Sequence, residues 1–152
     1  MKIIIDDLSG QEIADFLDQH IQDMKSTSSP ESKHALDLER LKSPDITFWS
    51  IYDVGHLVGC GAIKELNQFQ GEIKSMRTLT SMRGKGIASM LLNHIIETAK
   101  LRGYKKLNLE SGSMAFFEPA HQLYLKHGFK FCQPFANYKE DPNSVFMALI
   151  LR

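Results

Sequence analysis

The segment Arg83-Gly84-Lys85-Gly86-Ile87-Ala88 constrains the fold of this chain more than any other feature. It follows a strand-like stretch and begins a helix in which Ile87, Leu91, Ile95 and Ala99 recur at four-residue steps. The first N–H groups of a helix have no partner within the helix and favour an anion. Glycine leaves the backbone open to a phosphate group. The segment therefore predicts a cradle for a diphosphate, and hence for a nucleotide-bearing cofactor.

Length and composition favour one globular domain over residues 1–152. With 43% hydrophobic and 24% charged residues, the chain can form one core but is too short for two ordinary domains. No apolar run approaches the ~20 residues that cross a bilayer, so we expect no membrane partner. The 18 basic and 18 acidic residues give a formal net charge of zero, so we expect no nucleic-acid partner.

The cysteines and histidines predict neither redox nor metal chemistry. Cys60 and Cys132 lie in apolar, strand-like segments without the spacing of a metal or redox pair. We expect both to be buried free thiols, which suits a reducing, cytoplasmic location. No histidine pair has a spacing such as His-Glu-x-x-His, so we expect no catalytic metal.

The apolar periodicity predicts an α/β fold with a mixed, mostly antiparallel central sheet and helices on both faces. The expected order is β-α-α-β-β-β-α-β-α-β-β. We expect helices at about 10–25, 31–41, 87–102 and 118–127, and strands at 1–6, 47–53, 57–65, 72–79, 105–110, 129–132 and 145–151. If 145–151 is an edge strand, two copies can pair through it, so we expect a monomer or a homodimer.

Three known phosphate-binding patterns compete for the glycine segment. A P-loop requires Ser or Thr after its lysine, but Gly86 follows Lys85. The dinucleotide fingerprint Gly-x-Gly-x-x-Gly requires a glycine where Ser89 stands, and it usually follows the first strand of its unit. The third pattern, Arg/Gln-x-x-Gly-x-Gly/Ala, is satisfied by Arg83, Gly86 and Ala88. The segment therefore fits the third pattern best.

With this third pattern, the sequence resembles the GNAT superfamily of acyl-CoA-dependent N-acyltransferases. Residues 76–92 are similar to that family's strand, diphosphate loop and helix, and residues 120–129 match its segment A-x-x-L-Y-x-x-x-G-F. The resemblance covers about residues 48–131 and is strongest to small bacterial N-acetyltransferases. It implies a single-domain GNAT-like fold, a sheet splayed at the cofactor site, and acetyl-CoA as donor co-substrate.

The resemblance assigns the cofactor contacts to three segments. Backbone N–H groups of residues 83–88 would hold the CoA diphosphate, and the backbone of Met76 and Thr78 would pair with the pantetheine arm like an added strand. Strands 72–79 and 105–110 would have to splay apart for this. In the third segment, Phe117 stands where many members have an asparagine. The expected cofactor-binding residues are Met76, Arg77, Thr78, Arg83, Gly84, Lys85, Gly86, Ile87, Ala88, Phe117, Ala120 and Leu123.

Acetyl transfer from a thioester to an amine requires a neutral amine, a donor to the oxyanion and a proton for the departing thiolate. The resemblance places Tyr124 at the CoA sulfur as the acid. Glu72 is the first candidate for the base and Glu110 the second, either of them acting directly or through water. The backbone N–H of Met76 or Arg77 is the expected oxyanion donor.

The sequence leaves the amine acceptor open between a small molecule and a peptide. Candidates for lining its site are Trp49, Arg77, His34 and Tyr138, and Arg77 could attract a carboxylate on the acceptor. We expect direct transfer in a ternary complex, because neither cysteine is an evident covalent relay. Two alternatives stay open at this point: a non-catalytic acyl-CoA-binding module of the same fold, and a nucleotide-binding oxidoreductase.

Overall fold

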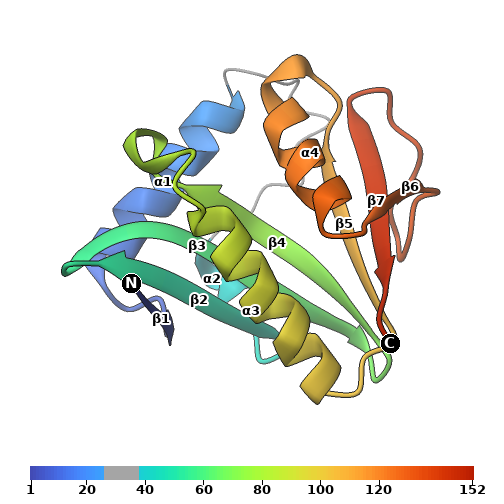
Figure 1. Ribbon diagram of the computed structural model, residues 1–152, viewed down its shortest axis with the longest axis horizontal. Coiled ribbons are helices and arrows are strands. Elements are labelled where there is room, and N and C mark those ends of the chain that lie inside the picture. The colour runs from blue at the N-terminus through green and yellow to red at the C-terminus, as the bar shows by residue number, and fades with distance from the viewer. Residues whose placement is uncertain (26–37) are drawn as a thin grey trace.

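The computed structural model describes residues 1–25 and 38–152, and its elements follow the predicted order (Figure 1). Residues 31–37 of the second predicted helix lie outside this range. The helices are α1 (Gln11–Lys25), α2 (Leu38–Leu41), α3 (Ile87–Leu101) and α4 (Glu118–Lys126). The strands are β1 (Lys2–Ile5), β2 (Ile46–Asp53), β3 (His56–Asn67), β4 (Gln70–Thr78), β5 (Lys106–Gly112), β6 (Lys130–Cys132) and β7 (Ser144–Ile150).

The strands of the described residues form one sheet in the order β1-β2-β3-β4-β5-β7-β6. Neighbouring strands are antiparallel except β4 and β5, which are parallel. Their pairing joins residues 70–73 to residues 106–109 and then ends. Beyond it the two strands diverge, as the green and orange arrows show in Figure 1. The expected mixed, mostly antiparallel sheet with a splay is confirmed.

A β-bulge in β4 lies at the start of this splay. In the register with β3, Lys74 faces Ala62 whereas Arg77 faces Cys60, so β4 has one extra residue in this interval. Ser75, inside the bulge, has a φ of 60°, an uncommon conformation for a residue other than glycine. A bulge bends a strand and increases its twist. It therefore helps to turn the end of β4 away from β5.

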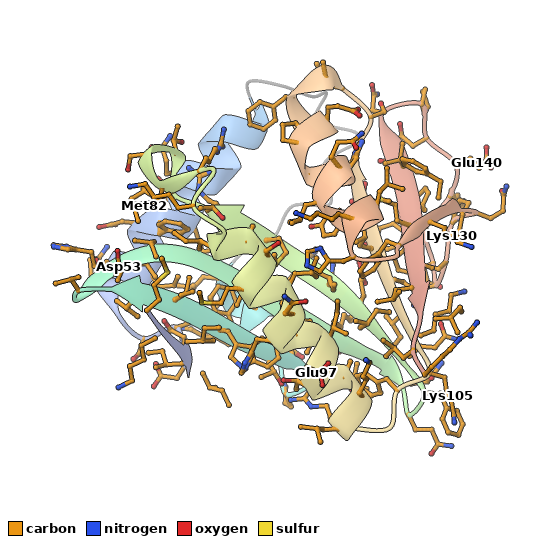
Figure 2. All side chains as sticks on the ribbon, in the orientation of Figure 1. Asp53, Met82, Glu97, Lys105, Lys130 and Glu140 are labelled. Carbon is orange, nitrogen blue, oxygen red and sulfur yellow. The ribbon has the colours of Figure 1, made fainter. Side chains whose placement is uncertain are left out.

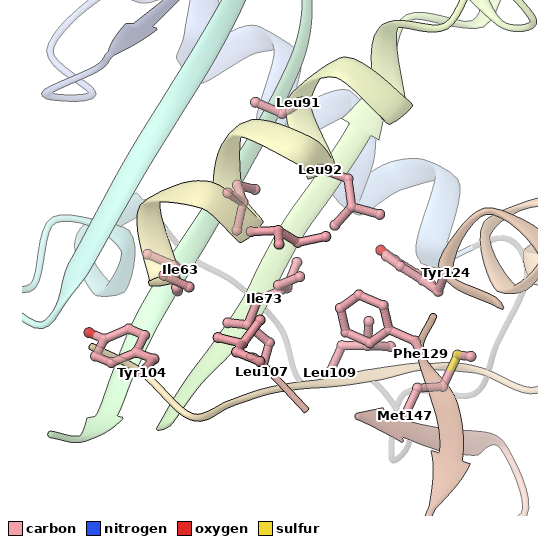
Figure 3. Packing of buried hydrophobic residues seen from close by; sticks show 14 of the residues in the cluster. Ile63, Ile73, Leu91, Leu92, Tyr104, Leu107, Leu109, Tyr124, Phe129 and Met147 are labelled. Carbon is pink, nitrogen blue, oxygen red and sulfur yellow. The ribbon is translucent and has the colours of Figure 1, made fainter. Parts of the chain in front are cut away.

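The helices cover both faces of the sheet, and each face has its own apolar core. On the face that we call the front, α3 and α4 pack on the strands (Figures 1 and 3). On the opposite, back face, α1 and α2 pack on a second cluster. The segment 133–143 extends the back layer, because its Phe135 and Tyr138 rings pack against Phe146 of β7.

The predicted apolar stripe of α3 is buried against the front face. Ile87, Leu91, Ile95 and Ala99 are each 1% exposed or less, and burial of such side chains contributes about 25 cal/mol per Å². Gly61 of β3 lets this helix approach closely, since a Cβ there would lie 3.2 Å from Leu91. Packing of the stripe thus fixes the start of α3 beside the diverging end of β4.

Two expectations about the last strands are wrong. Cys60 is buried, but Cys132 is exposed, because β6 is a three-residue edge strand whose side chains are all exposed. The strand at 144–150 is not at an edge: β7 lies between β5 and β6, so its backbone pairs on both sides and two copies cannot pair through it as expected. None of the helices in the described ranges is long and apolar enough to span a membrane.

Candidate active site

A cavity of about 380 Å³ lies on the front face, between the end of β4, the start of α3 and the first part of α4. All of the expected cofactor-binding residues except Lys85 line it. The lining consists of Met76, Arg77, Thr78, Met82, Arg83, Gly84, Gly86, Ile87, Ala88, Ser89, Phe116, Phe117, Pro119, Ala120, Leu123 and Tyr124. The ammonium of Lys85 instead lies 3.8 Å from the sulfur of Met82, in the turn labelled in Figure 2.

Two glycines shape the loop at one end of this cavity. Gly84 and Gly86 both have φ of +80°, a left-handed conformation that costs other residues about 1–2 kcal/mol. Gly86 is the N-cap of α3 and supplies no side-chain cap to the first-turn N–H groups. These N–H groups and the positive end of the helix dipole favour an anion at this place. Arg83 adds a cation to the same wall.

Tyr124 projects from α4 into the gap between α3 and α4 (Figure 3). Its ring is 6% exposed and packs edge-on against Phe129, with the ring centroids 5.6 Å apart. Burial raises the pKa of Tyr124 well above its ordinary value, so the phenol stays neutral and its hydroxyl can donate a hydrogen bond. No hydrogen bond to its hydroxyl occurs within residues 1–25 and 38–152. The hydroxyl is therefore available to a ligand in the cavity.

The back face carries a buried carboxylate, Glu72, at the paired end of β4. Glu72 is 3% exposed, and its Oε2 accepts a 2.6 Å hydrogen bond from the hydroxyl of Tyr138. The ammonium of Lys74 lies 3.3 Å from the same oxygen and 3.4 Å from that hydroxyl. A buried charge is tolerated only when it is paired and hydrogen-bonded, as Glu72 is here.

Glu110 of β5 lies on the same face, across the splay from Lys74. Its Oε2 accepts a 2.6 Å hydrogen bond from the hydroxyl of Ser144 on β7. Burial raises the pKa of Tyr138 strongly, and the negative charges of Glu72 and Glu110 raise it further. Tyr138 therefore stays a neutral donor beside both carboxylates. We call Glu72, Lys74, Arg77, Glu110 and Tyr138 the back-face cluster.

Arg77 stands where the front cavity and the back-face cluster meet. It lines the cavity, and its guanidinium lies 5.4 Å from the centre of the Phe16 ring of α1, on the back face. Of the other expected acceptor residues, Tyr138 belongs to the back-face cluster and His34 lies outside the described residues. Trp49 was wrongly expected there: it is 2% exposed and packs in the core, edge-on against His94 of α3.

Sequence reasoning missed several residues of the site. Lys74 was detectable in principle, because it follows Glu72 at the two-residue spacing that places side chains on one face of a strand. Ser144 and Phe135 gave no such signal, since their position depends on β7 lying next to β5. In the part of the chain that the structure describes, no group of three or more His, Cys, Asp or Glu residues is placed to hold a metal ion.

Comparison with known proteins agrees with this geometry. The sequence profile of the acetyltransferase (GNAT) family matches residues 14–129. The uncharacterized N-acetyltransferase YsnE of Bacillus subtilis (strain 168) is 56% identical over 97% of both chains. The uncharacterized N-acetyltransferase YedL of Escherichia coli (strain K12) is 46% identical over 96% of this chain and 92% of its own.

Solved structures show the same fold. A protein of Klebsiella pneumoniae assigned as an acyl-CoA N-acyltransferase superimposes with a TM-score of 0.85 and 27% identity, covering 99% of this chain and 97% of its own. An aminoglycoside 6'-N-acetyltransferase complexed with coenzyme A has a TM-score of 0.73 and 16% identity, covering 100% and 98% of the two chains. With a family match over residues 14–129 and relatives at this identity, the chain belongs to the GNAT family of acetyltransferases.

Proposed function

We propose that this protein transfers the acetyl group of acetyl-CoA directly to a primary amine while both substrates are bound. The observation that carries the proposal is one continuous cavity that joins the glycine loop before α3 to the end of β4 that does not pair with β5, with Tyr124 on its wall. Family membership supports the acetyl group, and the coenzyme A bound to the aminoglycoside enzyme of similar fold supports the donor.

The donor fits the cavity in two parts. The first-turn N–H groups of α3 and the side chain of Arg83 would hold the diphosphate. The backbone of residues 74–78, which does not pair with β5, would hydrogen-bond to the amides of the pantetheine arm. Apolar side chains of Ile87, Ala120 and Leu123 would contact its methylene groups. This arrangement directs the thioester toward Tyr124 and the back-face cluster.

Glu72 is the proposed base and Tyr124 the proposed acid. An alkyl ammonium has a pKa near ~10.4, so a base has to remove its proton before attack. The amine nitrogen then forms a bond to the thioester carbon, and the C–S bond breaks. Glu72 receives the ammonium proton before attack, directly or through water, and passes it to solvent. Tyr124 donates a proton to the thiolate, and the proton that the nitrogen loses as the amide forms returns to Tyr124 through water. Glu110 is the second candidate for the base, and the N–H of Met76 or Arg77 would stabilise the oxyanion.

Release of CoA from acetyl-CoA, measured across a panel of amines, tests the proposal. We expect turnover of at least one class of primary amine and saturation by both substrates in a sequential pattern. Tight binding of CoA without turnover of any amine would instead support the non-catalytic module. Binding of NAD in preference to CoA would support an oxidoreductase. A ping-pong pattern would contradict direct transfer.

A further inference from the structure

We infer that the acceptor is an amine that also carries a carboxylate, as a free amino acid does, and that Lys74 and Arg77 bind this carboxylate. The inference rests on the proposed function, because it names the acceptor class of the same site. It starts from the charges on the back face of β4, at the point where the strand leaves β5.

The bulge at Ser75 places the two cations on one face of the strand. Residues three apart in a regular strand point to opposite faces, because side chains alternate. Here Lys74 contacts Glu72 and Tyr138 on the back face, and Arg77 also lies on that face, against Phe16. The extra residue in the register with β3 accounts for this. The bulge at the start of the splay therefore also puts two positive charges on one face of the strand.

Both cations are held in place. The side chain of Lys74 is 14% exposed and is fixed by Glu72 and by the hydroxyl of Tyr138. The guanidinium of Arg77 lies over an aromatic ring, which restricts a side chain that is otherwise flexible. A planar guanidinium binds a carboxylate through two parallel hydrogen bonds. Since Arg77 also lines the front cavity, a carboxylate site at its guanidinium would lie beside the strand segment along which the donor is proposed to bind.

The carboxylates of the cluster complement the amino group of the same molecule. Glu72, in the last paired part of β4, and Glu110, across the splay from Lys74, lie on the face that carries Lys74 and Arg77. Two cations and two carboxylates match the two charges of an amino acid without a net charge left over.

The experiment compares each standard amino acid with its primary amide and with the amine that lacks the carboxylate, at saturating acetyl-CoA. For the preferred side chain, we expect kcat/KM to be at least about 10-fold higher for the acid than for the amide. In Arg77→Gln we expect kcat/KM for the acid to fall about 10- to 100-fold and kcat/KM for the amide to change less than about 3-fold. Lys126→Gln, an exposed cation of α4, should change neither.

The outcomes separate the inference from the proposed function. Equal use of acid and amide, or turnover of only amines without an acid group, would overturn the inference and leave the acetyltransferase. A rise in KM for acetyl-CoA in Arg77→Gln, without loss of discrimination, would assign Arg77 to the donor and overturn it as well. If no amine turns over, the proposed function fails. Titration of N-acetyl amino acids and their amides into the CoA-bound protein then still tests the carboxylate site, and equal affinity would overturn it.

Thermal unfolding and circular dichroism establish that the variants are folded. Lys74→Arg serves as a second variant, because it retains the charge next to Glu72. We expect Lys74→Arg to keep most of the preference for the acid, and Lys74→Gln to reduce it about 10-fold. An equal loss of activity with both substitutions, with the preference for the acid unchanged in the activity that remains, would show a structural role and contradict the assignment.

Discussion

The two faces of β4 present different chemical groups. On the front side, the cavity is lined by glycines, the start of a helix and apolar side chains, and the proposed contacts of the glycine loop are backbone N–H groups. On the back side, the cluster consists of ionisable side chains from β4, β5 and the segment 133–143. The front side would thus bind the CoA donor, which is the same in every turnover, and the back side would select the acceptor.

The difference shows how far each kind of recognition depends on neighbouring segments. Backbone N–H groups at the start of α3 belong to one continuous stretch, so six residues are sufficient to form the anion site. The back-face cluster forms only when Tyr138 reaches Glu72, 66 positions earlier in the chain. The proposed donor site is therefore local in the sequence, whereas the proposed acceptor site is not. The following variants test this division, beginning with the largest expected effect.

Tyr124→Phe removes the proposed acid from the front side. We expect kcat to fall about 100-fold, in the range of general acid catalysis, while KM for acetyl-CoA changes little. Tyr104→Phe is the control, because Tyr104 is also buried but donates its hydroxyl to Glu65, away from the cavity. It should lower stability by about 1 kcal/mol and leave kcat unchanged. An equal fall in kcat for both variants would mean that Tyr124 acts only through packing.

The raised pKa of Tyr124 also predicts how stability depends on pH. In the folded protein the phenol keeps its proton at a pH where the unfolded chain, with an ordinary pKa near ~10, loses it. The contribution of this residue to stability is therefore complete below about pH 10 and is lost as pH rises through the folded pKa. Urea unfolding should show that the free energy of unfolding falls less between pH 8 and pH 11 in Tyr124→Phe than in the wild type.

Glu72→Gln and Glu110→Gln compare the two carboxylates of the back side. Glutamine keeps an oxygen that accepts the hydrogen bond from Tyr138, but it cannot remove a proton. We expect Glu72→Gln to lower kcat/KM about 100-fold at neutral pH, with the deficit shrinking at high pH where the amine is already neutral. Glu110→Gln should lower kcat/KM by less than about 10-fold. The reverse order would assign the base to Glu110.

Gly86→Ala tests whether donor binding depends on the local backbone. Alanine at a φ of +80° is strained by about 1–2 kcal/mol, so we expect the affinity for acetyl-CoA to fall about 10-fold as the loop relaxes. Gly103→Ala is the matched control: its φ is +82°, and like Gly86 it has no atom within 4 Å of an added Cβ, but it lies after α3. Both variants should lose similar stability, as measured by thermal unfolding. An equal loss of CoA affinity would contradict a local anion site.

The smallest effect is expected at Cys132. This thiol is exposed, whereas burial raises the pKa of Cys60 to about 12, so a thiol reagent should label Cys132 alone in the folded protein. Because transfer is proposed to be direct, labelled protein and Cys132→Ser should retain kcat within about 2-fold. Mass spectrometry of the labelled peptide checks the site, and an acetyl group trapped on either cysteine would contradict direct transfer.

The order of the elements was predictable because each one carries its own local signal. The stripe Ile87, Leu91, Ile95 and Ala99 has helical spacing, and each of its members is buried. The errors concern neighbours rather than local structure. Cys132 was expected to be buried and β7 to be at an edge. The residues of a strand do not by themselves predict whether it has one neighbouring strand or two. Trp49 likewise packs under α3 because of the face on which β2 presents it.

The sequence by itself determined the strands, the helices and the glycine loop before α3, since these follow from periodicity and from the conformations that glycine allows. It also placed Arg77 and Tyr138 among the candidates for the acceptor site. Only the tertiary structure decided that Lys74, Arg77, Glu72 and Glu110 share one face at the splay. That grouping depends on a bulge in β4 and on pairing between β5 and β7, and contacts between distant segments leave no periodic pattern in the sequence.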